Sequence, residues 1–273
     1  MNPLPHWRDM TTEDFSADTS DWIAVLPIAA IEQHGPHLPL ATDAVIAEGM
    51  VARVVSALPR GLPATFLPVQ EVCKSNEHLD FPGTLTVGWD TAIRTWLEIG
   101  ASVARAGLRK LVIVTSHGGN VNPMGIAARE LRVEHGLMVV ATAWGATAEA
   151  ADLYPAEEAS YGIHGGAAET SMMLALRPDL VRMERTEDFR TAQLDLAARH
   201  QHLRAHGPAG IGWMAQDLHP AGVAGDATQA SAAAGEAQLT RHAEAFLALL
   251  TEIHATDPTT LLRPGPLGDL PSL

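Results

Sequence analysis

The five-residue run from Leu111 to Thr115 limits the possible folds of this chain more than any other segment. Four of its five residues are β-branched and none is charged, which is typical of a parallel strand buried on both faces. Apolar runs at 23–28, 64–69 and 137–143 predict three further strands. We therefore expect one mainly parallel sheet inside the molecule.

Segments with helical spacing alternate with these strands, at 43–58, 90–106, 123–135, 168–176 and 236–254. Thr42 is a candidate cap for the first helix, and Gly107 and Gly136 end two others. Strands and helices that alternate over short connections predict a parallel sheet covered on both faces, which is an α/β fold with three α/β/α layers. Sites in such sheets lie beyond the carboxyl ends of the strands.

A chain of 273 residues can bury one large core, and we interpret residues 1–273 as a single domain. Residues 257–273, which carry Pro264, Pro266 and Pro271, are expected to form an extended C-terminal arm. The sequence has no apolar run of about 20 residues and no signal-peptide pattern. A single cysteine, Cys73, excludes an internal disulfide and fits the reducing cytoplasm, where we expect the protein.

The charge balance argues against two classes of partner. The chain has 32 acidic and 18 basic residues, a net charge of −14, and its acidic residues are spread along the sequence. Nucleic acids and anionic membrane surfaces require clustered Lys and Arg. We therefore expect neither as a partner.

A polar motif directly follows the first predicted strand. Glu32 and His34 are two residues apart, so they are expected to point to the same side, and Asp43 lies where the next helix begins. Carboxylates and imidazoles in such a group suit zinc, manganese or iron. The motif predicts a metal site at the carboxyl end of the sheet.

Two further segments offer ligands. His117 follows the 111–115 strand in a Gly-rich turn and is expected to face the crevice, although it could instead cap the next helix. His164 precedes a helix whose first turns carry Glu169. Glu169 could simply complement the helix dipole, but a carboxylate beside an apolar stretch needs a partner, and a metal is a good one.

Other residues are candidates for contacting a substrate. Ser75, Glu77 and His78 form a polar loop in an apolar region, which could line a site or only turn the chain. Trp144 and Trp213 are the aromatics best placed to cover a small ligand, and either could equally belong to the core. The sequence lacks dinucleotide-binding, phosphate-binding and nucleophile-elbow motifs, so we expect catalysis to depend on metal-bound water.

These motifs resemble those of the creatininase family. The similarity lies in Glu-Gln-His-Gly-Pro-His-Leu-Pro at 32–39 with Asp43, in His-Gly-Gly-Asn at 117–120 and in the segment 164–171, with weaker likeness at 81–84 and 222–226. The resemblance implies a single α/β/α domain, a two-metal site and usually a homohexamer. Family members hydrolyse amide bonds, by opening creatinine, deformylating a formamidopyrimidine or trimming the mycofactocin precursor peptide.

The resemblance implies metal ligands at Glu32, His34, Asp43 and His117, with Asp43 as the bridge. The chain departs from the creatinine-opening enzymes at Gly119, where they carry Glu two residues after the His. One ligand must therefore come from elsewhere, and Glu169 is our candidate.

The expected reaction is attack of a hydroxide, held between two divalent zinc, manganese or iron ions, on the amide carbon of a creatinine-like small molecule. His164 would protonate the leaving nitrogen. Ser75, Glu77 and His78 would orient the substrate, and Trp144 or Trp213 would close over it. Peptide trimming and formamide deformylation are alternatives within the family, and a catalytically silent metal- or ligand-binding homologue is the alternative outside catalysis.

Overall fold

The computed structural model describes residues 2–148, 150–207 and 209–263. Its centre is a four-stranded sheet with the spatial order β2-β1-β3-β4, in which all neighbouring pairs are parallel. The strands are β1 (Ile23–Ile28), β2 (Ala64–Phe66), β3 (Lys110–Thr115) and β4 (Met138–Ala143). The predicted parallel sheet is confirmed.

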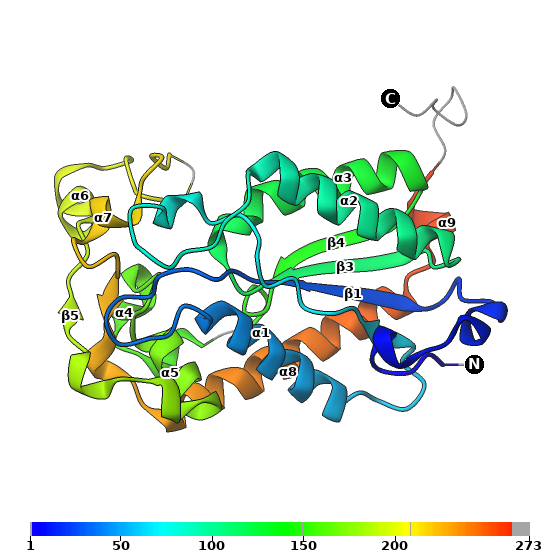
Figure 1. Cartoon of the computed structure of the whole chain (residues 1–273), viewed down its shortest axis with the longest axis horizontal. Coiled ribbons are helices and arrows are strands. Elements are labelled where there is room, and N and C mark those ends of the chain that lie inside the picture. The colour runs from blue at the N-terminus through cyan, green and yellow to red at the C-terminus, as the bar shows by residue number, and fades with distance from the viewer. Residues whose placement is uncertain (1, 149, 208, 264–273) are drawn as a thin grey trace.

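Helices cover both faces of this sheet. Helices α2 and α3 lie on one face, whereas α1 and α8 lie on the other, with α5 packed against both of them (Figure 1). Their bounds are α1 Thr42–Ser56, α2 Trp89–Arg105, α3 Val121–His135, α5 Ala167–Leu176 and α8 Ala232–Ala255. The protein therefore has the predicted three α/β/α layers.

Shorter elements gather at the end of the molecule to which the carboxyl ends of the strands point (Figure 1). They are α4 (Ala156–Tyr161), α6 (Gln193–Arg199), α7 (Ala215–Leu218) and the antiparallel pair β5 (Asp188–Phe189) and β6 (Gly225–Asp226). Helix α9 (Pro258–Leu261) lies at the opposite end. The short elements thus surround the edge of the sheet where sites are expected.

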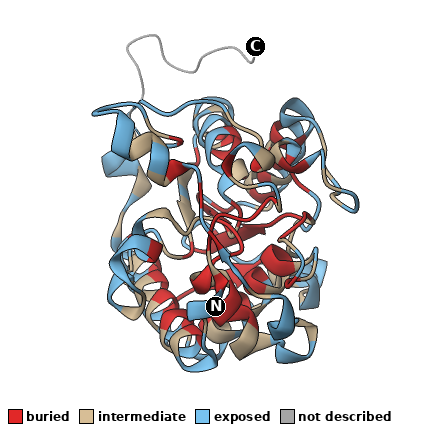
Figure 2. Ribbon diagram, turned by 90° about the vertical axis from the view of Figure 1, so that its left-hand side faces the viewer, coloured by how far each residue is buried: buried red, intermediate tan, exposed pale blue. Residues whose placement is uncertain are grey.

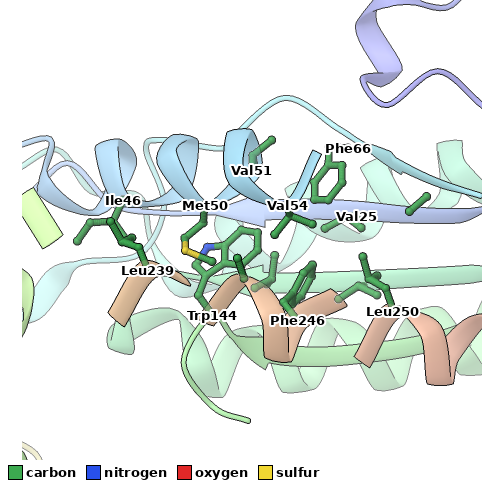
Figure 3. Packing of buried hydrophobic residues seen from close by; sticks show 14 of the residues in the cluster. Val25, Ile46, Met50, Val51, Val54, Phe66, Trp144, Leu239, Phe246 and Leu250 are labelled. Carbon is green, nitrogen blue, oxygen red and sulfur yellow. The ribbon is translucent and has the colours of Figure 1, made fainter. Parts of the chain in front are cut away.

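Successive side chains of a strand enter different halves of the core. Val25 of β1 packs with Met50 and Val54 of α1 and with Phe246 of α8 (Figure 3). Leu26, the next residue, belongs to the cluster on the opposite face, with residues of α2 and α3. This is the two-residue period of a strand buried on both faces. Figure 2 shows the same division, with buried residues along the sheet and exposed residues on the outer sides of the helices.

Some predicted boundaries were wrong. Strand β2 ends at Phe66, three residues before the predicted end. Thr42 is the first residue of α1 and not its cap, because its hydroxyl donates a hydrogen bond to the carbonyl oxygen of Pro39 at 2.7 Å. Helix α8 begins at Ala232, where Ser231 accepts a hydrogen bond from the amide of Ala234.

The predicted C-terminal arm begins with the short helix α9 instead of extended chain. Three of its prolines, Pro264, Pro266 and Pro271, lie outside the described residues. Among the described residues, no helix has the length and apolar character needed to cross a bilayer.

The crossing of α5 and α8 depends on a glycine. A Cβ atom added at Gly235 of α8 would lie 1.9 Å from the carbonyl oxygen of Ser171, which belongs to the backbone of α5. Glycine therefore allows the two helix backbones to approach closely. A Cβ at Gly125, in α3, would meet no atom within 4 Å.

Replacing Gly235 with Ala should lower the free energy of unfolding by about 1–3 kcal/mol, because the added methyl group forces the two helices apart. Gly125→Ala is the matched control. It should stabilise the protein by up to about 1 kcal/mol, since Ala has the higher helix propensity. Chemical denaturation of both variants measures the two effects, and a stabilised Gly235→Ala variant would contradict this account of the crossing.

Candidate metal centre

The five predicted metal ligands come together beyond the carboxyl ends of the strands. Glu32 and His34 follow β1, His117 follows β3, Asp43 lies in the first turn of α1 and Glu169 in the first turn of α5. The first four side chains are almost completely buried, whereas the side chain of Glu169 is 20% exposed. Parallel pairing of Ile28 with Thr115 brings the ends of β1 and β3 side by side.

Asp43 lies between two sets of potential ligands. His117 Nδ1 is 3.2 Å from Glu32 Oε1 and 3.4 Å from Asp43 Oδ2. His34 Nε2 is 3.8 Å from Asp43 Oδ1 and 3.7 Å from Glu169 Oε2. In each set the ligand atoms lie within 4.8 Å of one another, a spacing that could hold an ion. The two oxygens of Asp43 therefore face different histidines, as a bridging carboxylate requires.

Unpartnered atoms point to what these sets could hold. Glu32 Oε1, His34 Nε2 and Asp43 Oδ2 are buried and have no hydrogen-bond partner among the described residues. Buried polar atoms normally have a partner, and leaving one without is costly. His34 Nδ1 lies 3.1 Å from the carbonyl oxygen of Glu32, a contact that leaves Nε2 free for a cation. The residues thus fit bound divalent metal.

The electrostatics agree with this fit. Burial raises the pKa of Asp43 well above its usual range, and the neighbouring carboxylate of Glu32 raises it further. Burial also raises the pKa of Glu169. For Glu32, burial raises the pKa, but His117, His78 and His164 together outweigh burial and hold the pKa well below the usual range. Bound cations would relieve the repulsion among the three carboxylates.

The predicted substrate loop lies against the ligands. Ser75 is fully buried and its hydroxyl donates to Glu32 Oε2. His78 Nε2 lies 3.4 Å from Glu32 Oε1, and Glu77 Oε1 lies 3.4 Å from His117 Nε2. All three side chains thus contact a candidate ligand, an arrangement that their sequence did not predict.

His164 is the predicted acid catalyst, and its ring also borders the cluster. Its Nε2 lies 2.8 Å from the backbone carbonyl of Gln33 and donates to it, so Nδ1, 3.6 Å from Glu32 Oε1, is free to accept a proton. Burial lowers the pKa of His164 to about 4. The ring is therefore neutral near pH 7.

Two organising residues were missed from the sequence. Gln33 donates from Nε2 to the carbonyl of Gly222 and to His78 Nδ1, both at 2.7 Å, and thereby ties three segments together. His37 is fully buried and its Nε2 lies 2.9 Å from the carbonyl oxygen of Gly165. The sequence did contain one indication of their importance, because both residues lie within the polar motif at 32–37.

The two tryptophans differ in position. Trp144, expected as a cover, packs in the core, with its ring centroid 4.7 Å from that of Phe246 (Figure 3). The structure therefore favours the core position that the sequence also allowed over the role of a cover, because the chain after β4 turns the indole toward α8. Trp213 is half-buried in a small cluster with Ile163, the neighbour of His164. Its role as a cover remains a prediction.

Comparisons with known proteins identify related sequences and structures. A sequence profile of the creatininase family, described as creatinine amidohydrolase, matches residues 8–250. Mycofactocin precursor peptide peptidase of Mycobacterium tuberculosis is 34% identical over 251 residues, covering 86% of this chain and 89% of that protein. Creatinine amidohydrolase of Pseudomonas putida is 32% identical over 194 residues, covering 66% and 75%.

A solved structure of manganese creatininase superposes on this chain with a TM-score of 0.72 at 26% identity, covering 93% of this chain and all of the other. The fold and the profile together define an α/β/α hydrolase. The chain belongs to the creatininase family of amidohydrolases.

The state of His37 can be tested through pH. Burial lowers its pKa to about 4, and its Nδ1 has no hydrogen-bond partner, so protonation in the folded state is unfavourable. The unfolded chain takes up this proton below about pH 6.5, whereas the folded chain does so only near pH 4. The contribution of His37 to stability should therefore be lost as the pH falls across that window.

Between pH 7 and pH 5, wild type should lose of the order of 1 kcal/mol more stability than His37→Gln, which cannot be protonated. Urea unfolding at both pH values gives the four free energies. Equal losses in the two proteins would show that His37 does not titrate as its burial implies.

Proposed function

We propose that this protein is a divalent-metal-dependent amidohydrolase that cleaves the C–N bond of a small cyclic or linear amide. The observation that carries the proposal is the position of Asp43, whose two buried oxygens face two separate ligand sets. Glu32 and His117 complete one set, and His34 and Glu169 complete the other. Zinc and manganese suit these ligands, and iron is a further candidate.

A pair of divalent ions in these sets would activate a water molecule and polarise the amide carbonyl. The net reaction adds the hydroxyl group of water to the carbonyl carbon and a proton to the leaving nitrogen, as the C–N bond breaks. The protein must keep its ligands in place and move one proton.

His164 is suited to move this proton. Its Nδ1 lies toward Glu32 and is unprotonated, while Nε2 is held by the carbonyl of Gln33. Nδ1 would accept a proton from the attacking water and then deliver it to the leaving nitrogen, which is ordinary acid–base catalysis by histidine. Glu169, the most exposed of the five candidate ligands, would lie nearest to the substrate.

Peptide trimming is the second candidate, and one observation favours it. Trp144 lies in the core, so it does not close the site over a small molecule. The peptidase of Mycobacterium tuberculosis is also more fully covered by the alignment than the creatinine-hydrolysing relative. A substrate panel must therefore include short peptides beside creatinine, other cyclic amides and formamides.

Three further expectations remain proposals. They are a single domain over residues 1–273, a cytoplasmic location and, from the family resemblance alone, a homohexamer. Sedimentation of the purified protein tests the hexamer directly.

Elemental analysis with activity assays tests the metal centre. Wild type should contain about two ions per chain and hydrolyse a member of the panel. Asp43→Asn should lose metal from both positions, because both ligand sets share this carboxylate, and its turnover should fall by at least about 10²–10³-fold.

Glu48→Gln is the matched control, since Glu48 is an exposed carboxylate on the same helix. Two ions retained by Asp43→Asn would contradict the bridging role. Two ions in wild type without hydrolysis of any amide would favour the silent metal-binding homologue instead.

A further inference from the structure

Glu77 occupies the space beside Gly119. A Cβ atom added at Gly119 would lie 2.0 Å from Glu77 Oε1 and 2.3 Å from His117 Nε2. A Cβ at the preceding Gly118 would meet nothing within 4 Å. The backbone of Gly119 does not have the left-handed conformation that requires glycine. Glycine is therefore needed at 119 because a larger side chain would clash, and not because of the backbone conformation. The atoms that it would meet belong to Glu77 and His117.

The carboxylate of Glu77 lies between the side chains of Lys74 and His117. Oε2 accepts from Lys74 Nζ at 2.5 Å, and Oε1 lies 3.4 Å from His117 Nε2, a buried atom with no hydrogen-bond partner among the described residues. The Glu77 side chain is only 12% exposed. The loop is tied to the same segment a second time, because the amide of Lys74 donates to Asn120 Oδ1 at 3.3 Å.

The two nitrogens of His117 therefore face different groups. Nδ1 faces Glu32 and Asp43, whereas Nε2 faces Glu77. A carboxylate that accepts a hydrogen bond from the outer N–H of a ligating histidine fixes the tautomer and the orientation of the ring. Glu77 does not belong to the groups of atoms close enough to hold an ion.

We propose that Glu77 is a positioning residue, held by Lys74, that orients His117 for the Glu32–Asp43–His117 ligand set, and that position 119 is glycine to admit its carboxylate. The proposal rests on the proposed metal centre and deepens it. It also replaces the expected substrate contact of Glu77 with a role in metal affinity. The carboxylate of Glu77 thus fills the space that a side chain at position 119 would need.

Metal affinity measured by competition with a chromophoric chelator tests this assignment. Protein stripped of metal is titrated with Zn²⁺, and again with Mn²⁺. Glu77→Gln should bind one of the two ions about 10–100-fold more weakly, because outer partners of ligands contribute about that much, and should bind the other ion unchanged. Glu71→Gln, an exposed carboxylate nearby, is the matched control and should bind both ions as wild type does.

Substitutions of Gly118 and Gly119 provide an independent test by the same metal titration. Gly119→Ala should weaken the same ion as Glu77→Gln, whereas Gly118→Ala should have no effect. The double variant Glu77→Gln/Gly119→Ala should lose no more affinity than the larger single loss, because both changes act on His117. If Glu77→Gln does not fold, as judged by circular dichroism, Gly119→Ala retains the carboxylate and still tests the proposal.

The outcomes separate the two proposals. Unchanged affinities in Glu77→Gln with a raised KM would assign Glu77 to the substrate and overturn the positioning role. Equal losses of metal affinity in Gly118→Ala and Gly119→Ala would contradict the claim that position 119 is glycine to make room for Glu77. Wild-type protein that binds neither cation would contradict the metal centre itself, whatever the variants do.

Discussion

A single buried carboxylate, that of Asp43, determines how the rest of the site must be arranged. It lies in the first turn of α1, which packs against the sheet, so its position is set by the core and not by a mobile loop. The segment between β1 and α1 is folded tightly enough for the amide of Glu32 to donate to the carbonyl of Leu40 at 2.9 Å. This compact turn brings the side chains of Glu32 and His34 close to the carboxylate of Asp43.

Much of the fold and the ligand set could be predicted because both depend on short stretches of sequence. Buried parallel strands are marked by apolar, β-branched runs, as in β3. Parallel strands also present their carboxyl ends at one edge, so polar residues that directly follow β1 and β3 had to meet. Glu169 was harder to place, since it lies on α5, yet a carboxylate before a buried apolar stretch indicated a partner.

The roles of the supporting residues could not be predicted, because they depend on contacts between distant segments. Ser75 and Glu77 had the composition of a substrate loop, and only the packing of that loop against β1 and β3 shows that they contact ligands. Gln33 lies between two candidate ligands in the sequence, whereas its side-chain amide connects segments more than 100 residues apart. Trp144 was ambiguous for the same reason, since the direction of the chain after β4 decides which side of the sheet its ring covers.

The ligand cluster draws its members from residue 32 to residue 169, so no short piece of the chain can form it. An ion that binds this cluster binds the folded chain and not the unfolded one, and the folded state gains free energy as the free ion concentration rises. Supply of metal to the proposed centre would then influence how much folded protein exists as well as how active it is. Under metal scarcity, the chain would be exposed to unfolding and proteolysis before any substrate was lacking.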